Sequence, residues 1–550
     1  MMRSEEPATR DARRPPWQDL RWITAGVVAG LVGLLAWGLF GPEPPLTVAR
    51  NTTFLTAPLA ADGLPDYGAA LLAAMGPAPK PGGNAAVELL QVMWPLGIDA
   101  ADLPAVCQAL GIPAVPPAHP LRKPTQDAAT KVTSEMLDAA VERPWTGAEF
   151  PELAAWLVAR ETALDRLVAA ADRPRYWLPS PTLLRPGPQM LVGVLLPELS
   201  DGRTVARLLV CRAMGHVGAG RHAAAWRDIR AVHRLGRLLA VPEKVPQFMV
   251  TQLVAMATNA QADAALTRGP LAAADLPIDV LAEIRRDLDA LGPLPNPADG
   301  LANERLFGID ATVWLARRTP GGRTGRHALF GIGPGELVGA ALLTSLDWDL
   351  ILERMNARYD QVEAAVRLPT RAARQTQLDR LTQELQEPVS RSGWGTAGQV
   401  LLGSCSRGHR SVFVSDALGG LLLPATGGWL NALTRGQASF DLTRTAAALA
   451  AWKADQAAGE AAYPETLAAL VPQYLPAVPL DPFTDQPFIY ERRGAGYLLA
   501  SVGDNGVYDS GDDKNGWIVG GEWQTSRQEV DSRKWDLVVR MPVPPRPAAP

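Results

Sequence analysis

One charge-free apolar segment near the N-terminus constrains this chain more than any other feature. It runs from Trp22 to Phe40 and contains neither a charged residue nor a proline. As a helix it would be about 28 Å long, close to the hydrocarbon thickness of a bilayer. Trp22 and Trp37 lie near its two ends, where tryptophan rings favour the membrane interface. The segment therefore predicts a single transmembrane helix.

The basic residues around this segment predict its orientation. Five arginines precede it, and the first basic residue after it is Arg50. The positive-inside rule therefore holds the N-terminus in the cytoplasm and puts the bulk of the chain outside, in the periplasm of a bacterial cell. A cleaved signal peptide is the alternative. The apolar run is longer than such peptides use, and "GLFGPEPP" lacks a small-residue cleavage site, so we expect an uncleaved anchor.

A second apolar stretch, Val412–Leu430, has a similar length but a different character. It contains Asp416, Pro424 and four glycines. A charge at membrane depth costs about 2.5–3.5 kcal/mol on insertion scales. We therefore expect a buried or docking segment there, and one membrane span in all.

The length of 550 residues allows several domains. We divide the chain into six parts. The first three are a cytoplasmic tail (1–21), the anchor (22–40) and a Pro/Ala-rich stalk or irregular lobe (41–150). The other three are an α-helical domain (151–436), a small α+β domain (437–530) and a C-terminal strand with a proline-rich tail (531–550). The predicted fold class is mainly α, with a short antiparallel sheet near the C-terminus. A net charge of −4 argues against a nucleic-acid binder, which would carry a basic excess.

The three cysteines, Cys107, Cys211 and Cys405, are far apart and form no CxxC pair. One disulfide could form outside the cytoplasm. Three small buried apolar side chains are the simpler interpretation.

The helical domain is predicted from apolar spacing. Residues 203–240 read as two helices joined by a turn at Gly218-Ala219-Gly220. In the second helix, apolar residues recur three and four apart, which makes one buried stripe: Trp226, Ile229, Val232, Leu235 and Leu239. Further helices are expected around 247–267, 277–291 and 345–369, the last with the clearest apolar face.

Four arginines share one face of that second helix. Arg227, Arg230, Arg234 and Arg237 recur three and four residues apart. Such a face could bind an anion, such as a phosphate or a lipid headgroup, or it could be a solvated surface.

Three histidines lie nearby without the spacing of a zinc site. His216, His222 and His233 are 6 and 11 residues apart, and no i, i+4 pair exists among them. The sequence also contains no GxSxG motif and no phosphate-binding GxxxxGK[ST] loop. We therefore expect no enzyme, and we name no catalytic residue.

The C-terminal part has its own order of signals. A helix from about Gln437 is followed by Tyr463-Pro464, a proline-fixed segment and a hairpin around Gly494-Ala495-Gly496. Two further segments, "GWIVGGEW" and "KWDLVVRMPV", are expected to add strands.

This order resembles the C-terminal region of the major pseudopilin of the type II secretion system, over residues 437–520. The positions that match its pattern are Tyr463, Pro464, Leu467, Leu470, Pro479, Asp481, Pro482, Tyr490, Ser501, Gly503, Gly506, Asp512 and Asp513. Phe483 and Thr484 stand where the family has tryptophan and glycine. The apolar helix at 22–40 lacks the family's processing site, so we expect an anchored protein with a pseudopilin-like head rather than a filament subunit.

In that family the acidic loop holds calcium, and the resemblance implies a calcium site here. The implied ligands are Asp504, Asn505, Asp509, Asp512 and Asp513. Their oxygens suit calcium, which takes six to eight hard ligands. A rival EF-hand-like register from Gly511 to Glu522 has glycine in place of its first aspartate. A solvated acidic hairpin without metal is the remaining alternative.

Three functions follow from these signals. The first is a membrane-anchored exoplasmic structural or interaction protein, associated by resemblance with secretion or pilus-like machinery. The second is an exoplasmic hydrolase with an unrecognised active site. The third is a helical scaffold that binds anionic ligands through the arginine face.

Overall fold

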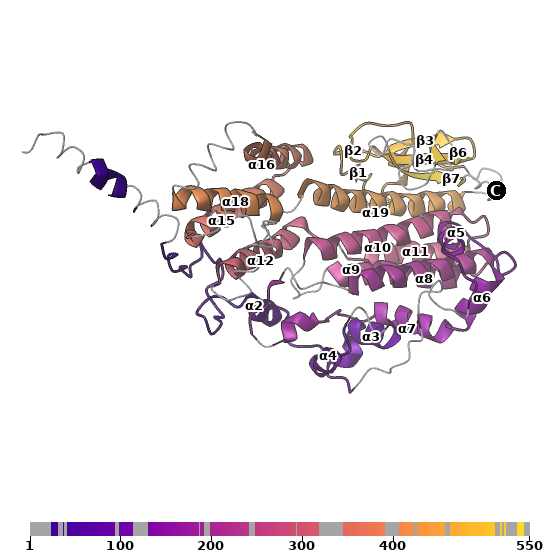
Figure 1. Cartoon of the computed structure of the whole chain (residues 1–550). Coiled ribbons are helices and arrows are strands. Elements are labelled where there is room, and N and C mark those ends of the chain that lie inside the picture. Colours follow the sequence, from indigo (N-terminus) through magenta and orange to yellow (C-terminus); the bar gives the residue numbers. More distant parts are fainter. Residues whose placement is uncertain are drawn as a thin grey trace, which may run out of the picture. The chain divides into compact units, whose positions relative to one another are not determined.

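The chain is mainly helical, with a small antiparallel sheet near its C-terminus (Figure 1). The computed structural model describes residues 24–30, 33, 37, 41–93, 98–113, 121, 130–185, 187–191, 198–240, 248–292, 294–317, 345–390, 406–422, 426–456, 462–511, 518–519, 522–523 and 536–543. The predicted fold class is confirmed at this level.

The predicted anchor, 22–40, lies mostly outside the described residues, although Thr24–Gly30 is helical. Within the described ranges, no helix combines the length and the apolarity that a bilayer crossing needs. The transmembrane helix therefore stays a prediction.

The chain divides into two compact units. One comprises Met1–Thr56, Ala311–Arg358 and Thr382–Leu423, and the other comprises Ala57–Asp310, Tyr359–Leu381 and Pro424–Pro550. Each unit gathers segments that are far apart in the sequence.

In the first unit, helix α18 (Arg407–Leu422) covers most of the second apolar stretch. Val414 and Leu418 are buried, as expected for a buried segment. The charge of its one carboxylate, Asp416, is paired. Arg354 of α15 (Trp348–Val366) donates to it over 2.9 Å, and Arg358 also forms an ion pair with it.

The second unit begins with short helices in the region predicted as a stalk or irregular lobe. These are α2 (Tyr67–Ala74), α3 (Ala85–Met93), α4 (Leu103–Leu110) and α5 (Ser134–Glu142). Leu90 and Val92 of α3 are fully buried. Helix α3 packs on α7 (Glu161–Ala171), so the region forms a folded lobe.

The core of this unit is built from long helices. They are α8 (Glu198–Gly218), α9 (His222–Ala240), α10 (Met249–Arg268), α11 (Ile278–Ala290), α12 (Pro297–Ala316), which ends in the first unit, and α19 (Thr426–Asp455). Helix α10 packs on α8, α9 and α19. The predicted turn between α8 and α9 is confirmed, and Gly220 there has the positive φ of 72° that favours glycine.

The apolar stripe of α9 is buried as its spacing predicted. Trp226, Ile229 and Val232 are at most 1% exposed. Gly236 lets α9 approach α10 closely, because a Cβ there would lie 2.5 Å from the side-chain amide of Asn259. This close packing fixes the orientation of α9, and so of its arginines, relative to α10.

The sheet follows α19 in the chain and packs against it. Strands β3 (Ile489–Arg493) and β4 (Gly496–Ser501) form the predicted hairpin, with Ile489 opposite Ala500. Strand β7 (Leu537–Met541) pairs with the other edge of β4, with Leu499 opposite Val539. Two-residue pairs complete the region: β1 (Leu480–Asp481) with β2 (Gln486–Pro487), and β5 (Ile518–Val519) with β6 (Glu522–Trp523).

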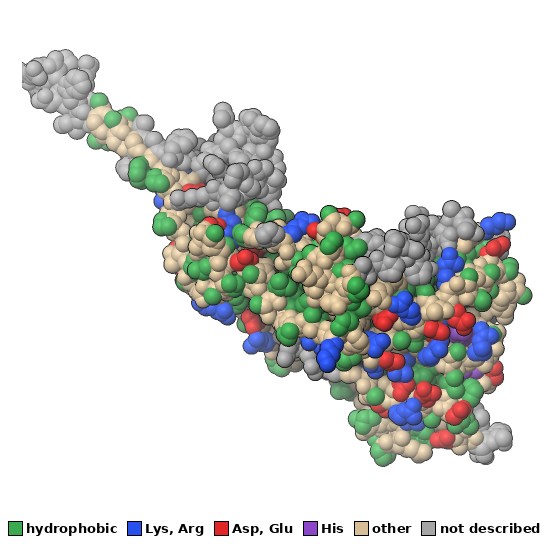
Figure 2. Space-filling model, turned by 90° about the horizontal axis from the view of Figure 1, so that it is seen from below, with side chains coloured by type: hydrophobic (Ala, Val, Ile, Leu, Met, Phe, Trp, Pro, Cys, Tyr) green, Lys and Arg blue, Asp and Glu red, His purple; other side chains and the backbone are tan. Residues whose placement is uncertain are grey.

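Charge on the surface is mixed in sign. Figure 2 shows lysine and arginine side chains interspersed with aspartate and glutamate on one face of the molecule. This matches the small net charge of −4. A specific electrostatic site must therefore be sought in a local imbalance of charge.

Candidate functional site

The arginine face of α9 lies against α7 rather than in open solvent. Arg227 pairs with Asp165 over 2.8 Å, and Arg230 pairs with Asp172 over 2.9 Å. The Nε of Arg234 donates to the Ala171 carbonyl over 2.8 Å. Asp165 and Asp172 are seven residues apart in α7 and its C-cap, so they share one side of that helix. The interpretation of this face as simply solvated is therefore incomplete.

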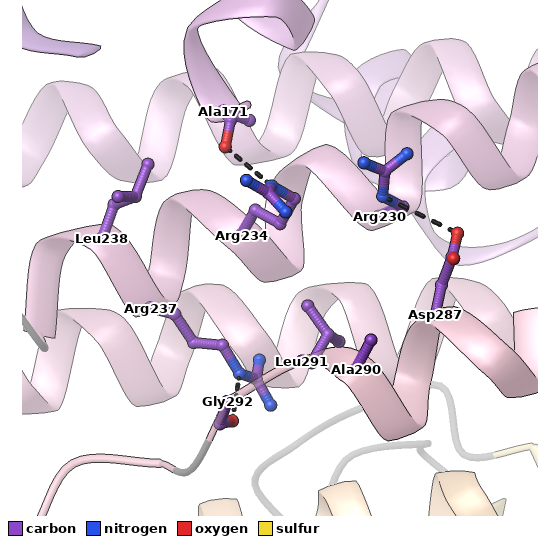
Figure 3. A pocket seen from close by; sticks show the side chains of 9 residues that line it. All are labelled: Ala171, Arg230, Arg234, Arg237, Leu238, Asp287, Ala290, Leu291 and Gly292. Atoms are coloured by element: carbon purple, nitrogen blue, oxygen red, sulfur yellow. Dashed lines mark hydrogen bonds and ion pairs between the residues drawn. The ribbon is translucent and has the colours of Figure 1, made fainter. Parts of the chain in front are cut away.

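Three of the four arginines line a cavity of about 300 Å³ (Figure 3). Arg230, Arg234 and Arg237 enter it from α9, together with Leu238. The opposite wall comes from the end of α11 and the residues after it: Asp287, Ala290, Leu291 and Gly292. Arg227 is absent from this lining, although it belongs to the same helical face.

Positive charge exceeds negative charge in this cavity. Its lining holds three guanidinium groups and one carboxylate, that of Asp287. Asp287 accepts a hydrogen bond from the Trp226 indole over 3.1 Å and lies 3.7 Å from the Nε of Arg230. Outside the lining, Asp172 pairs with both Arg230 and Arg234, over 2.9 and 3.2 Å. Three guanidiniums against these two carboxylates leave an excess of one positive charge, which favours an anion.

Arg237 is the most enclosed of the three, with only 8% of its surface exposed. Its Nε donates to the Gly292 carbonyl over 2.9 Å, and its Nη1 donates to Asn259 over 2.5 Å. The guanidinium also stacks on the Phe440 ring, 4.6 Å from its centroid. Its Nη2 is buried and has no hydrogen-bond partner among the described residues.

Burial lowers the pKa of Arg237 to about 10, and only part of that loss is offset by the attraction of Asp263. A buried guanidinium nitrogen without a partner is costly, because its charge has lost water and gained no acceptor. An anion at Nη2 would supply that acceptor. The Nη2 of Arg237 therefore makes the cavity a candidate anion-binding site.

A second layer of polar groups lies behind Arg237. The Nε2 of His233 is 3.7 Å from Asp263, and its Nδ1 is 3.3 Å from the Asn259 side-chain oxygen. Burial lowers the pKa of His233 to about 3, and burial raises the pKa of Asp263 to about 7. His233 is therefore neutral at physiological pH, and Asp263 titrates within that range.

The other histidines do not join this group. His216 accepts from Arg221 over 3.1 Å, and burial lowers its pKa to about 4. His222 lies 3.1 Å from Asp275. Cys107 and Cys211 are buried thiols, and burial raises the pKa of Cys211 to about 12. Cys405 lies outside the described residues.

The acidic loop after β4 contains only part of the implied calcium set. Asp504 forms an ion pair with Arg435 of α19, and Asp509 accepts from the Asn505 amide over 2.8 Å. Asp512 and Asp513 lie outside the described residues. Among the residues that the structure does describe, no group of three or more His, Cys, Asp or Glu side chains is arranged to hold a metal ion. The calcium site stays a prediction.

Another carboxylate organises this loop, and sequence reasoning missed it. Asp536 is fully buried and accepts from the backbone amides of Asp509 and Gly511, over 3.0 and 2.8 Å. It precedes β7, about 25 residues after the loop, and no local pattern links the two. The missed partners of the arginine face, Asp165 and Asp172, did carry a signal, since a seven-residue spacing puts two residues on one side of a helix.

Compared with family models, curated proteins and solved structures, the chain matches none of them.

Proposed function

We propose that this protein is a membrane-tethered, exoplasmic binding protein whose helical region holds a small anion in the arginine cavity. The buried Nη2 of Arg237, which has no partner among the described residues, is the observation that carries the proposal. The anion would be a phosphate or a carboxylate, because both match the planar donor fork of arginine.

The geometry of the cavity suits a small ligand. Its volume of about 300 Å³ is at the lower end for small-molecule sites. Arg230 and Arg234 are held in place by Asp172 and by the Ala171 carbonyl, so little side-chain entropy remains to be lost on binding. Leu238 and Leu291 add apolar wall to the same cavity. The ligand would thus meet a pre-formed site.

The role is binding rather than catalysis. The side chains that line the cavity are arginines, aliphatic residues and Asp287, and none of them is a nucleophile next to a base. Cys211 and His216 are the groups that a hydrolase could use. Cys211 is buried and His216 is partly buried, and their pKa values keep the thiol protonated and the imidazole neutral at pH 7.

The test is a titration of the full-length protein in detergent with inorganic phosphate and with acetate. The Arg237→Gln variant should bind at least about 30-fold more weakly, since removal of one partner from a buried charge pair costs about 2–5 kcal/mol. Arg227→Gln is the matched control, because Arg227 shares the helical face without lining the cavity.

Arg237 also supports the fold through Gly292 and Asn259, so a second variant separates binding from stability. Arg230→Gln removes a less buried cavity charge and should weaken phosphate about 10-fold with an unchanged melting temperature. Equal binding by the wild type, Arg230→Gln and Arg237→Gln would refute the anion site.

A second candidate function is partner binding by the C-terminal module, as the pseudopilin resemblance implies. Contacts between matched positions support it. The Tyr490 hydroxyl donates to the Pro464 carbonyl over 2.7 Å, and the Ser501 hydroxyl donates to Asp481 over 2.9 Å. Affinity purification of the full chain from membranes tests this idea. Secretion or pilus-like components should co-purify, and recovery of the protein alone would count against it.

A further inference from the structure

A second cavity, of about 520 Å³, lies where the end of α15 meets α16 (Arg371–Ser390) and α19. Arg367, Arg371 and Arg374 contribute three guanidinium groups to its lining. No carboxylate is found among the described residues that line it. It shares no lining residue with the arginine cavity of α9, so the two cavities can be tested separately.

Arg371 is positioned by three contacts. Its Nη2 donates to the Asp504 carbonyl over 3.5 Å. Its Nη2 also donates to the Asn431 side chain over 3.0 Å, and its guanidinium lies 4.7 Å from the centroid of the Phe483 ring. Burial lowers the pKa of Arg371. Its Nε is buried and has no hydrogen-bond partner in the described part of the chain. Arg371 is therefore partly dehydrated, with donor capacity left over.

The Arg374 side chain, which lines the cavity, is held in place by the backbone. Its Nη1 donates to the Leu368 carbonyl over 2.9 Å, so the side chain is tied to the end of α15. Arg371 and Arg374 also belong to the first turn of α16, where the helix dipole is positive. Arg367 forms an ion pair with Glu363. The guanidiniums of Arg371 and Arg374 and the helix N-terminus together favour an anion at this point.

The remaining polar lining differs from that of the first cavity. Gln375 and Asn431 contribute carboxamides, and Thr434 contributes a hydroxyl. Gln375 already donates to Asp379, and Thr434 to the Leu430 carbonyl, each over 2.8 Å. Their side-chain oxygens remain able to accept hydrogen bonds from sugar hydroxyls. Pro297, Val366 and Leu430 form the apolar part of the wall. The lining thus combines charge recognition with recognition of several hydroxyls.

We propose that this cavity binds an anionic sugar, a polyhydroxylated molecule with one carboxylate or phosphate group. The guanidiniums of Arg371 and Arg374 hold the anionic group, and Gln375, Asn431 and Thr434 face the hydroxyls. Sugar acids and sugar phosphates share this chemistry, and the experiment below distinguishes between them.

The test titrates the full-length protein with four probes: glucuronate, glucose 6-phosphate, glucose and inorganic phosphate. At least one of the two anionic sugars should bind at least about 10-fold more tightly than glucose or phosphate, because only it satisfies both sets of groups. Preference for glucuronate assigns a sugar acid, and preference for glucose 6-phosphate assigns a sugar phosphate. Glucose binding as tightly as both anionic sugars would overturn the proposal. Phosphate binding as tightly as both in the Arg230→Gln variant, in which the α9 cavity is weakened, would also overturn it.

Two variants separate the roles of charge and carboxamide. Arg374→Gln should weaken the preferred sugar at least about 10-fold. Gln375→Leu should weaken it about 3- to 10-fold and leave phosphate binding unchanged. Their melting temperatures report whether the fold is intact, and neither residue is fully buried.

Arg230→Gln is the control that keeps this inference distinct from the anion site of α9. It should leave binding of the anionic sugar unchanged. If Arg230→Gln abolished sugar binding while Arg374→Gln did not, the sugar would be assigned to the first cavity and the present proposal would fail. Weakened phosphate binding in Arg230→Gln, with sugar binding intact, would support two separate anion sites.

Discussion

The arginine face of α9 and the acidic loop after β4 each concentrate charge of one sign in a short stretch, but their surroundings neutralise them differently. On α9, the exposed arginines pair with carboxylates of α7, while the innermost, Arg237, is buried with donor capacity left over. In the loop, the described carboxylates have close partners: Arg435 for Asp504 and Asn505 for Asp509.

The difference follows from the backbone. A rigid helix fixes where each arginine points, so a partner must come from whatever neighbouring helix lies there. A loop has free backbone amides, and carboxylates can accept from them directly. Charge on the helix therefore leaves room for a ligand, whereas charge near the loop is used largely to build structure.

The largest expected effect tests the structural role of carboxylates beside the loop. Asp481 is 2% exposed and accepts from the Phe483 amide, the Ser501 hydroxyl and the Val502 amide, over 2.9–3.0 Å. Asp481→Ala leaves these buried donors unsatisfied. It should destabilise the C-terminal module by about 3–5 kcal/mol, measured by chemical denaturation of the full chain.

Asp485→Asn is the matched control, four residues later in the same turn. Asp485 is exposed and has a φ of 58°, which asparagine tolerates. Its substitution should change stability by less than about 0.5 kcal/mol. A similar loss in both variants would show that the turn as a whole, and not the Asp481 carboxylate, holds the module together.

Asp263, which lies behind the arginine cavity, should make the free energy of unfolding depend on pH. Burial raises the pKa of Asp263 to about 7, above its unfolded value near 3.8. The folded state therefore binds a proton more tightly than the unfolded state. The stability that this gives is complete below about pH 4 and is lost as pH rises to about 7.

Asp263→Asn removes this titration. Relative to the wild type, the variant should gain up to about 4 kcal/mol of stability between pH 4 and pH 8. His233 stays neutral in the folded state over this range because its pKa is about 3, and its effect is common to both proteins. Unfolding free energies measured at several pH values give the difference directly. Parallel curves for the two proteins would contradict the role of Asp263.

The comparison also shows what the sequence could and could not predict. The spacing of Arg227, Arg230, Arg234 and Arg237 correctly predicted one shared helical face, and the β3–β4 hairpin followed from its glycines. Both are local patterns. The Gly292 carbonyl and the Phe440 ring, which complete the surroundings of Arg237, are 55 and 203 residues away in the chain.

Long-range contacts also limited how much of the acidic loop and its neighbouring strand could be predicted from the sequence. The strand around 537–541 was expected, but its position beside β4 and the reach of Asp536 to the loop amides depend on tertiary packing. The calcium set implied by resemblance treated Asp504 as a ligand, whereas its nearest cation in the structure is the Arg435 guanidinium.

The smallest expected effect is that of calcium on the acidic loop. Because Asp504 is already paired with Arg435, we expect calcium to depend on Asp512 and Asp513, with Asp504 contributing little. At about ten times its dissociation constant, calcium would stabilise the protein by about 1.4 kcal/mol, seen as a rise of about 1–3 °C in the melting temperature of the full chain. The double variant Asp512→Asn/Asp513→Asn should abolish this rise, and Asp504→Asn should retain most of it. A rise that survives the double variant would place calcium elsewhere. No rise at millimolar calcium in the wild type would show that the loop is an acidic hairpin without metal. Arginine and amide groups would then neutralise its carboxylates, which is the role that the resemblance assigns to an ion.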